Sequence, residues 1–293
     1  MDLDRVLHYS AFTIDALTSD SDALPVDGAG GNPAGVVLDA DDLDDATRQR
    51  IAAAVGYSET AFVDRPGADG VRRLRYFSPQ AEVDFCGHAT VAAAVALADR
   101  GESGALGFAI NAGRLDVTTG ETPRGRTATL TSVPTRTRAA EPEEVAAALS
   151  ALRWAADDLD PRYPPHVAYA GNDHLVLAVR ERARLAALDY DFPALAALMA
   201  RRGWTTVHLV WAQSPTEFAA RDPFPPGGVV EDPATGAAAA AFGGYLRELG
   251  LVPLPARVTI DQGVDMGRPS RLLVDIEPDD PRVRVTGGAS RFR

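Results

Sequence analysis

Residues 87–101 read GHATVAAAVALADRG, and residues 236–250 read GAAAAAFGGYLRELG. Each stretch opens on a glycine, continues through very small residues and reaches a second glycine at the same interval, since 101 − 87 = 14 and 250 − 236 = 14. Because helices often end at a glycine in the left-handed conformation, both stretches are predicted to be helices that end at Gly101 and Gly250. Such small side chains favour a helix buried inside each half of the chain.

The regions before these helices also resemble each other. Gly31-Asn32 precedes the apolar run 36–38, and Gly171-Asn172 precedes the apolar run 175–177; each run is followed by helical spacing and a further strand. The chain is therefore predicted to be a duplication, and the break fits best near Pro134–Glu144. We expect an N-terminal half over 1–134 and a C-terminal half over 135–282, with a final strand near 283–293 that packs on the first half.

Alternation of apolar and polar residues predicts strands, and helical spacing predicts helices. The expected strands include 71–77, 128–133 and 284–286, and the expected helices include 44–55, which ends at Gly56, 142–152 after Glu141, and one that starts at 191–193. The fold class is therefore α+β.

Composition excludes several classes of partner. The chain of 293 residues has 41 acidic and 29 basic residues, a net charge of −12, and no basic run that would bind a nucleic acid backbone. Its longest apolar stretches, near 91–98 and 237–246, are too short to cross a bilayer, and the N-terminus lacks a signal pattern. We expect a cytoplasmic protein with no nucleic acid or membrane partner.

The sequence also argues against cofactors. Every basic residue is an arginine, so no lysine can form a Schiff base or serve a phosphate-binding loop. Cys86 is the lone cysteine, which excludes an internal disulfide and any two-thiol mechanism within one chain. His166 and His174 lack companions at zinc-motif spacing, so neither a metal nor an organic cofactor is expected.

Titratable residues lie beside the two glycine-led helices. The free N–H groups at the starts of these helices, at Gly87 and Gly236, can bind a carboxylate. Cys86, His88 and Asp232 flank these starts, and Glu59 lies between a helix-ending glycine and an apolar strand. All four suit proton transfer.

Each of these residues also has a structural interpretation. Glu59 could be solvated, His88 could bond to backbone, Asp232 could cap the next helix, and Cys86 could be a small buried residue.

Five motifs together resemble the PhzF-like (phenazine biosynthesis protein) family. They follow the family order over nearly the whole chain, from residue 10 to residue 290: Gly31-Asn-Pro-Ala-Gly-Val-Val37, Ser58-Glu-Thr-Ala-Phe-Val63, Cys86-Gly-His-Ala-Thr90, Glu231-Asp-Pro-Ala-Thr-Gly236 and Met266-Gly-Arg-Pro-Ser270.

The resemblance implies a diaminopimelate-epimerase-like fold. In that fold two pseudo-symmetric domains each wrap a curved, mostly antiparallel sheet around a central helix, with the active site in the cleft between them. Family members usually form homodimers, so a homodimer is expected here.

The resemblance also implies a cofactor-independent isomerase that shifts a hydrogen on a cyclic dienoic acid. Glu59 would be the proton shuttle, with His88 and Asp232 beside a small carboxylate substrate. The expected substrate-binding residues are Asn32, Cys86, Gly87, Ala89, Gly236 and Ala237.

Two positions depart from the family pattern. Ala237 stands where the family commonly has serine, so one hydrogen bond to the substrate is absent or supplied by backbone. Asp173 replaces the usual proline before His-Leu, and this charge favours a substrate other than the phenazine precursor.

Two other functions stay open. Cys86 and Asp232 could act as opposed acid and base in an amino or hydroxy acid epimerase or racemase, although epimerases of this fold generally use two thiols. A non-catalytic protein that binds small carboxylates is the second alternative; Ala237 favours it, and the combined presence of Glu59, His88 and Asp232 argues against it. The sequence does not identify the substrate.

Overall fold

The chain divides into two compact units in a computed structural model that describes residues 3–14 and 30–292. The first unit comprises Met1–Thr131, Arg268–Arg271 and Thr286–Arg293, and the second comprises Ser132–Gly267 and Leu272–Val285. The sequence analysis did not anticipate that Arg268–Arg271 belongs to the first unit.

Strands of the first unit close into a ring. Its strands are β1 (Leu7–Ala11), β2 (Asn32–Leu38), β3 (Glu59–Pro66), β4 (Arg72–Phe77), β5 (Glu82–Val83), β6 (Ala105–Ile110), β7 (Gly113–Thr122), β8 (Gly125–Thr131) and the later part of β17 (Val283–Arg291). Pairing runs from β1 through β2, β3, β4, β6, β7 and β8 to β17, which pairs with β1 again. The pairs β2–β3 and β4–β6 are parallel, and most of the others are antiparallel.

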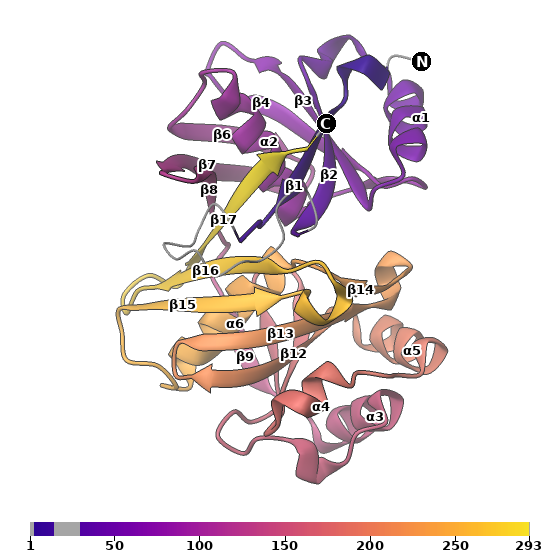
Figure 1. Ribbon diagram of the computed structural model, residues 1–293, viewed down its shortest axis with the longest axis vertical. Helices are drawn as coiled ribbons and strands as arrows, with labels where there is room; N and C mark the ends of the chain where they lie inside the picture. The colour runs from indigo at the N-terminus through magenta and orange to yellow at the C-terminus, as the bar shows by residue number, and fades with distance from the viewer. Residues whose placement is uncertain (1–2, 15–29, 293) are drawn as a thin grey trace. The chain divides into compact units, whose positions relative to one another are not determined.

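Helix α2 (Gly87–Asp99) is the helix predicted after Gly87. It packs against β1, β2, β3, β7 and β8, and every residue from His88 to Ala98 is buried. Strands surround it in the ribbon of the first unit (Figure 1). Alanine and valine fill most of its length, and their small volume lets strands approach the helix axis closely.

Helix α1 (Asp45–Val55) connects the parallel strands β2 and β3. Asp44 caps its N-terminus by accepting a hydrogen bond from the Thr47 amide at 2.8 Å, and Gly56 ends it with φ 74°. Ile51 is fully buried in a cluster with residues of β2 and β3. The predicted helix 44–55 is confirmed. Two short 3-10 helices, η1 (Leu3–Arg5) and η2 (Ala40–Asp42), complete this unit.

The second unit has its own sheet and helices. Its strands are β9 (Arg136–Ala139), β10 (His166–Tyr169), β11 (Asp173–Ala178), β12 (Trp204–Ser214), β13 (Glu217–Phe224), β14 (Val229–Asp232), β15 (Ala256–Gln262), β16 (Ser270–Ile276) and the first residues of β17. The helices are α3 (Pro142–Leu152), α4 (Arg182–Ala186), α5 (Phe192–Arg202), α6 (Gly236–Glu248), and the 3-10 helices η3 (Ala156–Asp158), η4 (Pro225–Gly227) and η5 (Val264–Met266).

Two cores support the sheet of the second unit. Helix α6 packs against β9, β10 and β11, and residues Ala238–Leu246 are buried. Helices α3 and α5 contact each other and contribute Leu152, Leu195 and Met199 to a cluster that also contains Leu175 of β11. The starts of α3 after Glu141 and of α5 after Asp191 confirm the sequence prediction.

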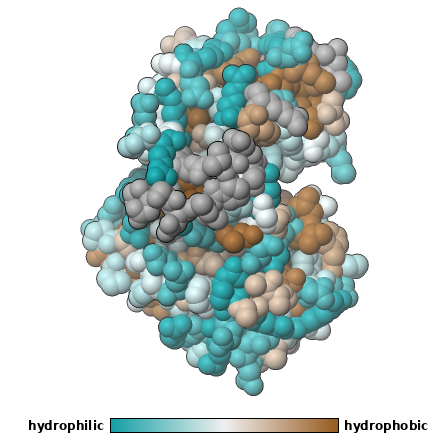
Figure 2. All heavy atoms as spheres, in the orientation of Figure 1, coloured by the Kyte–Doolittle hydropathy of each residue, from teal (hydrophilic) through white to brown (hydrophobic). Residues whose placement is uncertain are grey.

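Both units have a surface of mixed polarity. On the face in Figure 2, hydrophobic residues form small separate areas among hydrophilic ones in each unit. Among the described residues, no helix has both the length and the apolar character needed to cross a bilayer. The expected homodimer and the cytoplasmic location stay predictions.

Candidate active site

Glu59 is the first residue of β3 and lies shortly after Gly56, the glycine that ends α1. It pairs with Ala34 of the parallel strand β2. Its side chain is 15% exposed, so the carboxylate lies at the border of the first unit's core and remains within reach of a small molecule. Glu59 is therefore not a freely solvated surface glutamate.

Cys86 and His88 lie at the N-terminus of α2, where Cys86 is the N-cap residue. The Cys86 carbonyl accepts hydrogen bonds from the Thr90 amide at 3.1 Å and from the Thr90 hydroxyl at 2.7 Å. The buried Tyr76 hydroxyl contacts the same Thr90 oxygen at 2.6 Å. These bonds fix the first turn of α2, and with it the directions of the Cys86 and His88 side chains.

His88 connects the polar groups of this site. Its Nε2 lies 3.4 Å from Oε2 of Glu59 and 3.3 Å from Oγ of Ser58. Its Nδ1 lies 3.3 Å from Sγ of Cys86. The sequence analysis did not include Ser58 among the site residues, although it directly precedes Glu59. The structure thus brings Glu59, His88 and Cys86 together in the first unit.

Burial decides the charge of His88. Removal from water lowers the pKa of the imidazole below its ordinary value of 6.5, and this effect outweighs the opposing Glu59 carboxylate and the hydrogen bond to the Pro33 backbone. The imidazole is therefore neutral near pH 7. A neutral ring can donate from one nitrogen and accept at the other, which suits proton transfer beside a carboxylate.

The loop residues Gly30 and Gly31 lead into Asn32, one of the predicted substrate-binding residues and the first residue of β2. Asn32 is 2% exposed and pairs with Ala11 of β1. Its neighbour Gly31 has φ 72°, and its amide donates to the Pro269 carbonyl at 2.9 Å while its carbonyl accepts from Arg268 Nε at 3.0 Å. The Met266–Ser270 motif therefore secures this loop, a role that the sequence analysis did not assign.

The two glycine-led helices begin as predicted. Gly87 and Gly236 are the first residues of α2 and α6, and neither adopts the left-handed conformation. The glycines after the helices do, with φ 90° at Gly101 and 63° at Gly250. Ala89 is fully buried in the first turn of α2, so its contribution to binding would come from its backbone N–H.

In the second unit, Asp232 is the last residue of β14 and is partly buried. Its Oδ2 accepts a hydrogen bond from the Thr235 hydroxyl at 2.6 Å, and its carbonyl accepts from Gln262 Nε2 at 2.7 Å. Thr235, not Asp232, is the N-cap of α6. Gln262 is fully buried and also accepts from the Thr235 amide at 3.1 Å, so it joins the end of β14 to the start of α6. No pattern in the sequence predicted that Gln262 would belong to this site. Ala237 lies partly buried in the first turn of α6.

Buried polar residues in the second unit lie next to this segment. His174 Nδ1 contacts the Thr206 hydroxyl oxygen at 2.8 Å, Thr206 donates to Asp222 at 2.9 Å, and His208 Nδ1 lies 3.0 Å from the other Asp222 oxygen. Asp222 pairs with Asp232 across β13 and β14. Burial lowers the pKa of His174 to about 3, so this ring is neutral. His174 is therefore part of a buried hydrogen-bonded network in the core of the second unit.

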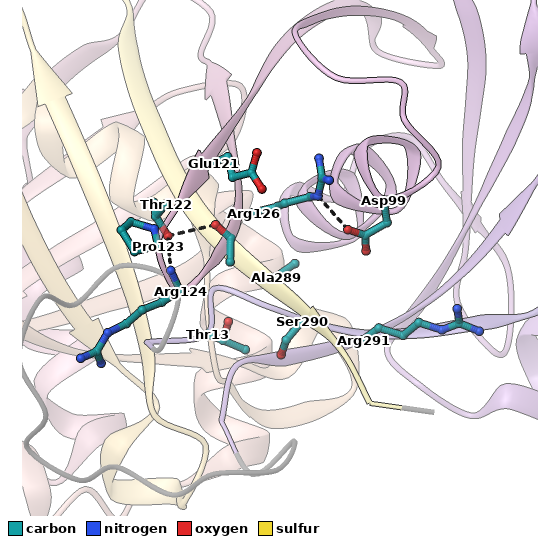
Figure 3. A pocket seen from close by; sticks show the side chains of 11 residues that line it. Thr13, Asp99, Glu121, Thr122, Pro123, Arg124, Arg126, Ala289, Ser290 and Arg291 are labelled. Carbon is teal, nitrogen blue, oxygen red and sulfur yellow. Dashed lines mark hydrogen bonds and ion pairs between the residues drawn. The ribbon is translucent and has the colours of Figure 1, made fainter.

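A surface hollow of about 390 Å³ lies elsewhere in the first unit. Figure 3 shows Arg126 directed toward Asp99, and this pair is 3.0 Å apart. None of the predicted site residues lines this hollow. The hollow therefore carries no assignment.

Comparisons with known proteins agree with these motifs. The family model described as "Phenazine biosynthesis-like protein" matches residues 21–293. An uncharacterized isomerase of Deinococcus radiodurans is 36% identical over 262 residues, covering 87% of this chain and 85% of the relative. The trans-2,3-dihydro-3-hydroxyanthranilate isomerase of Pseudomonas aeruginosa is 31% identical over 283 residues, covering 92% of this chain and 95% of the relative.

Solved structures give the same fold. A Bacillus anthracis phenazine biosynthesis protein of the PhzF family has a TM-score of 0.83 at 25% identity, covering 98% of this chain and 96% of that chain. A probable proline racemase of Agrobacterium radiobacter has a TM-score of 0.64 at 13% identity, covering 98% of this chain and 90% of that chain. The latter likeness concerns the fold alone, and agrees with an epimerase-like fold.

Proposed function

The chain is an isomerase that belongs to the phenazine biosynthesis-like protein family, and we propose that the Glu59 carboxylate is its proton shuttle. The observation that carries this proposal is the 3.4 Å contact between Oε2 of Glu59 and Nε2 of a buried His88. The Glu59 side chain is 15% exposed, so it lies close to a buried imidazole and keeps some accessible surface, as a general acid–base group requires.

The proposed reaction moves one proton between two carbon atoms. Glu59 takes a proton from a substrate carbon, and the electron pair of that C–H bond spreads into the adjacent unsaturated system. The protonated Glu59 then returns the proton to another carbon. The substrate and product have the same composition, so the reaction consumes no oxidant or reductant, and the proposed step uses no metal or organic cofactor.

His88 has a separate role in this proposal. As a neutral imidazole it contacts the Glu59 carboxylate at 3.4 Å and keeps it oriented toward the substrate, with Ser58 and Cys86 fixing the ring. Because burial opposes a positive charge on His88, the contact is not an ion pair.

The proposed substrate is a small cyclic carboxylate with conjugated double bonds. The related Pseudomonas aeruginosa enzyme, 31% identical, is named for a dihydro-hydroxyanthranilate, which is a compound of this class. We propose that the free amides at the start of α2, together with Asn32, bind its carboxylate. In the second unit, Asp232 and the backbone at Gly236 and Ala237 are proposed as substrate-binding groups.

A second candidate is an epimerase that uses Cys86. The 3.3 Å contact between Cys86 Sγ and His88 Nδ1 favours it, because an adjacent imidazole can accept a thiol proton. Asp232 would have to replace the second thiol that such epimerases generally use. Substitution of Cys86 separates this candidate from the isomerase.

Proton exchange with solvent tests both candidates. The wild-type protein is incubated in deuterated water with small carboxylates, including cyclohexadienoic and amino acids, and NMR follows deuterium at carbon. The proposal expects exchange that Glu59→Gln abolishes and Cys86→Ser retains. Exchange that only Cys86→Ser abolishes would establish the epimerase instead.

A further inference from the structure

Three metal-binding side chains of different kinds meet at the start of α2. The carboxylate of Glu59, the thiol of Cys86 and the imidazole of His88 each offer a donor atom, and these atoms all lie within 4.8 Å of one another. A carboxylate, a thiol and an imidazole are the ligand types that Zn²⁺ prefers. The proton shuttle described above uses only the carboxylate and the imidazole, and leaves the thiol without a chemical role.

Part of this arrangement matches the spacing of tetrahedral zinc ligands. Zinc bonds of about 2.0–2.3 Å at tetrahedral angles place N and O donors about 3.4 Å apart and N and S donors about 3.6 Å apart. His88 Nε2 lies 3.4 Å from Oε2 of Glu59. Sγ of Cys86 lies 3.9 Å from this nitrogen and 3.3 Å from Nδ1, so the cysteine side chain must rotate toward Nε2 to become the third ligand.

The surroundings also favour the forms of these groups that bind metal. A hydrogen bond to the Pro33 carbonyl orients the imidazole ring, as is common for histidine ligands. Cys86 is the N-cap of α2, and the positive end of a helix stabilises a thiolate. Metal binding would displace the thiol proton into solvent, and no other bond would need to change.

We propose that Glu59, Cys86 and His88 bind one Zn²⁺ ion, and that this ion inhibits the enzyme. Three protein ligands leave the fourth position to water. A metal bound to Oε2 of Glu59 takes the electron pair that proton abstraction requires. The inhibition rests on the proposed function, whereas the metal site itself does not.

The first test uses Co²⁺ as a spectroscopic substitute for Zn²⁺. The full-length protein is treated with chelator, titrated with Co²⁺, and the thiolate-to-cobalt absorption is followed; Zn²⁺ is then added to displace the cobalt. We expect one Co²⁺ per chain and an absorption that disappears in Cys86→Ser. Substitution of a residue that only orients a metal ligand typically weakens binding by about 10–100-fold. Glu59→Gln and His88→Gln should weaken Zn²⁺ binding by more than this.

A matched control is Glu143→Gln, which alters an exposed glutamate of α3 and should leave Zn²⁺ binding unchanged. Circular dichroism of each variant verifies folding. Alkylation of Cys86, the lone thiol, gives a second readout, because bound Zn²⁺ should protect it from iodoacetamide. Absence of the thiolate absorption, or equal Zn²⁺ binding in Cys86→Ser, would overturn the proposed site.

The inhibition is tested with the deuterium exchange assay described above. One equivalent of Zn²⁺ should suppress exchange, and chelator should restore it. Exchange that continues with Zn²⁺ bound would refute inhibition. If Zn²⁺ binds but Glu59→Gln still exchanges at the wild-type rate, the metal site stands and the proton-shuttle proposal fails.

Discussion

His88 differs from most histidines that contact a carboxylate. A solvent-exposed pair of this kind is usually an ion pair, because the carboxylate raises the histidine pKa. Here burial has the larger effect, so the pKa is lowered and the pair is a neutral imidazole next to Glu59.

Gly31 is predicted to be intolerant of any side chain. It has φ 72°, and a Cβ atom at this position would lie 2.5 Å from the Ala11 carbonyl oxygen and 2.7 Å from the Ser10 hydroxyl oxygen. Gly31→Ala therefore combines backbone strain of about 1–2 kcal/mol with a steric clash. Urea unfolding should show a loss of stability well above the strain alone.

Gly56→Ala provides the control for this measurement. Gly56 has nearly the same φ, 74°, but a Cβ atom would meet nothing within 4 Å. Gly56→Ala should therefore lose only about 1–2 kcal/mol of stability, which is the cost of the backbone strain. Equal losses in the two variants would show that the close approach at Gly31 does not exist.

The sequence predicted the local features of the site better than its long-range contacts. Cys86, His88 and the start of α2 follow from neighbouring residues, and Glu59 stands out as a charge before an apolar strand. Arg268 contacts the Gly31 carbonyl, which lies 237 positions earlier in the sequence. No feature of the sequence distinguishes Gln262 from other strand residues, and its hydrogen bond from the Thr235 amide is visible only in the structure. Contacts of this kind depend on the tertiary fold, and periodicity carries no information about them.

At the scale of elements, helix starts are determined by short polar motifs. The first turn of α3 has a capping box, in which the Glu144 carboxylate accepts from the Glu141 amide at 2.9 Å. The same carboxylate binds both terminal nitrogens of Arg138, at 2.8 and 2.9 Å. Glu144 thus joins β9 to α3, which explains why a glutamate is 2% exposed there.

These contacts make stability depend on pH. The Arg138 guanidinium lowers the pKa of Glu144 from 4.5 to about 2, so the contribution of its charged form is complete above pH 4.5 and is lost as pH falls toward 2. Glu144→Gln should lose about 1–2 kcal/mol of unfolding free energy at pH 7. Denaturation across this pH range should show the two proteins converging in acid. A pH-independent difference would contradict the assigned cause.

Both units contain a parallel pair of strands joined through helices, β2–α1–β3 in the first and β11–α4–α5–β12 in the second. This similar order agrees with the duplication that was inferred from Gly31-Asn32 and Gly171-Asn172. The second connection has two helices, α4 and α5, which form a core with α3. A sequence repeat of two dipeptides could not reveal this difference.

At the scale of the whole molecule, the C-terminal strand completes the first unit. The later residues of β17 pair with β1, and Thr286 contacts Thr129 of β8 at 2.7 Å. The carbonyl of Gly288 also accepts a hydrogen bond from the Phe12 amide at 2.6 Å. The ring of strands can therefore close only after β17 has been synthesised.

Truncation after Val285 tests the role of this strand. Without it, β1 and β8 lose their shared partner, and the unpaired backbone groups at the two edges destabilise the first unit. Hydrogen exchange should accelerate in β1 and β8, whereas β11 and β12 of the second unit serve as the internal reference. Unchanged protection of β1 and β8 would contradict the closed ring.

The central claim is that Glu59 carries the proton, and one comparison tests it most directly. The turnover rate and the substrate affinity are measured for the wild-type protein and for Glu59→Gln, which keeps the size and hydrogen-bonding capacity of the side chain. Loss of general acid–base catalysis should lower kcat by about 10²–10⁴-fold while the substrate Kd changes little. A kcat within a few-fold of wild type would contradict the account and assign the proton to another group.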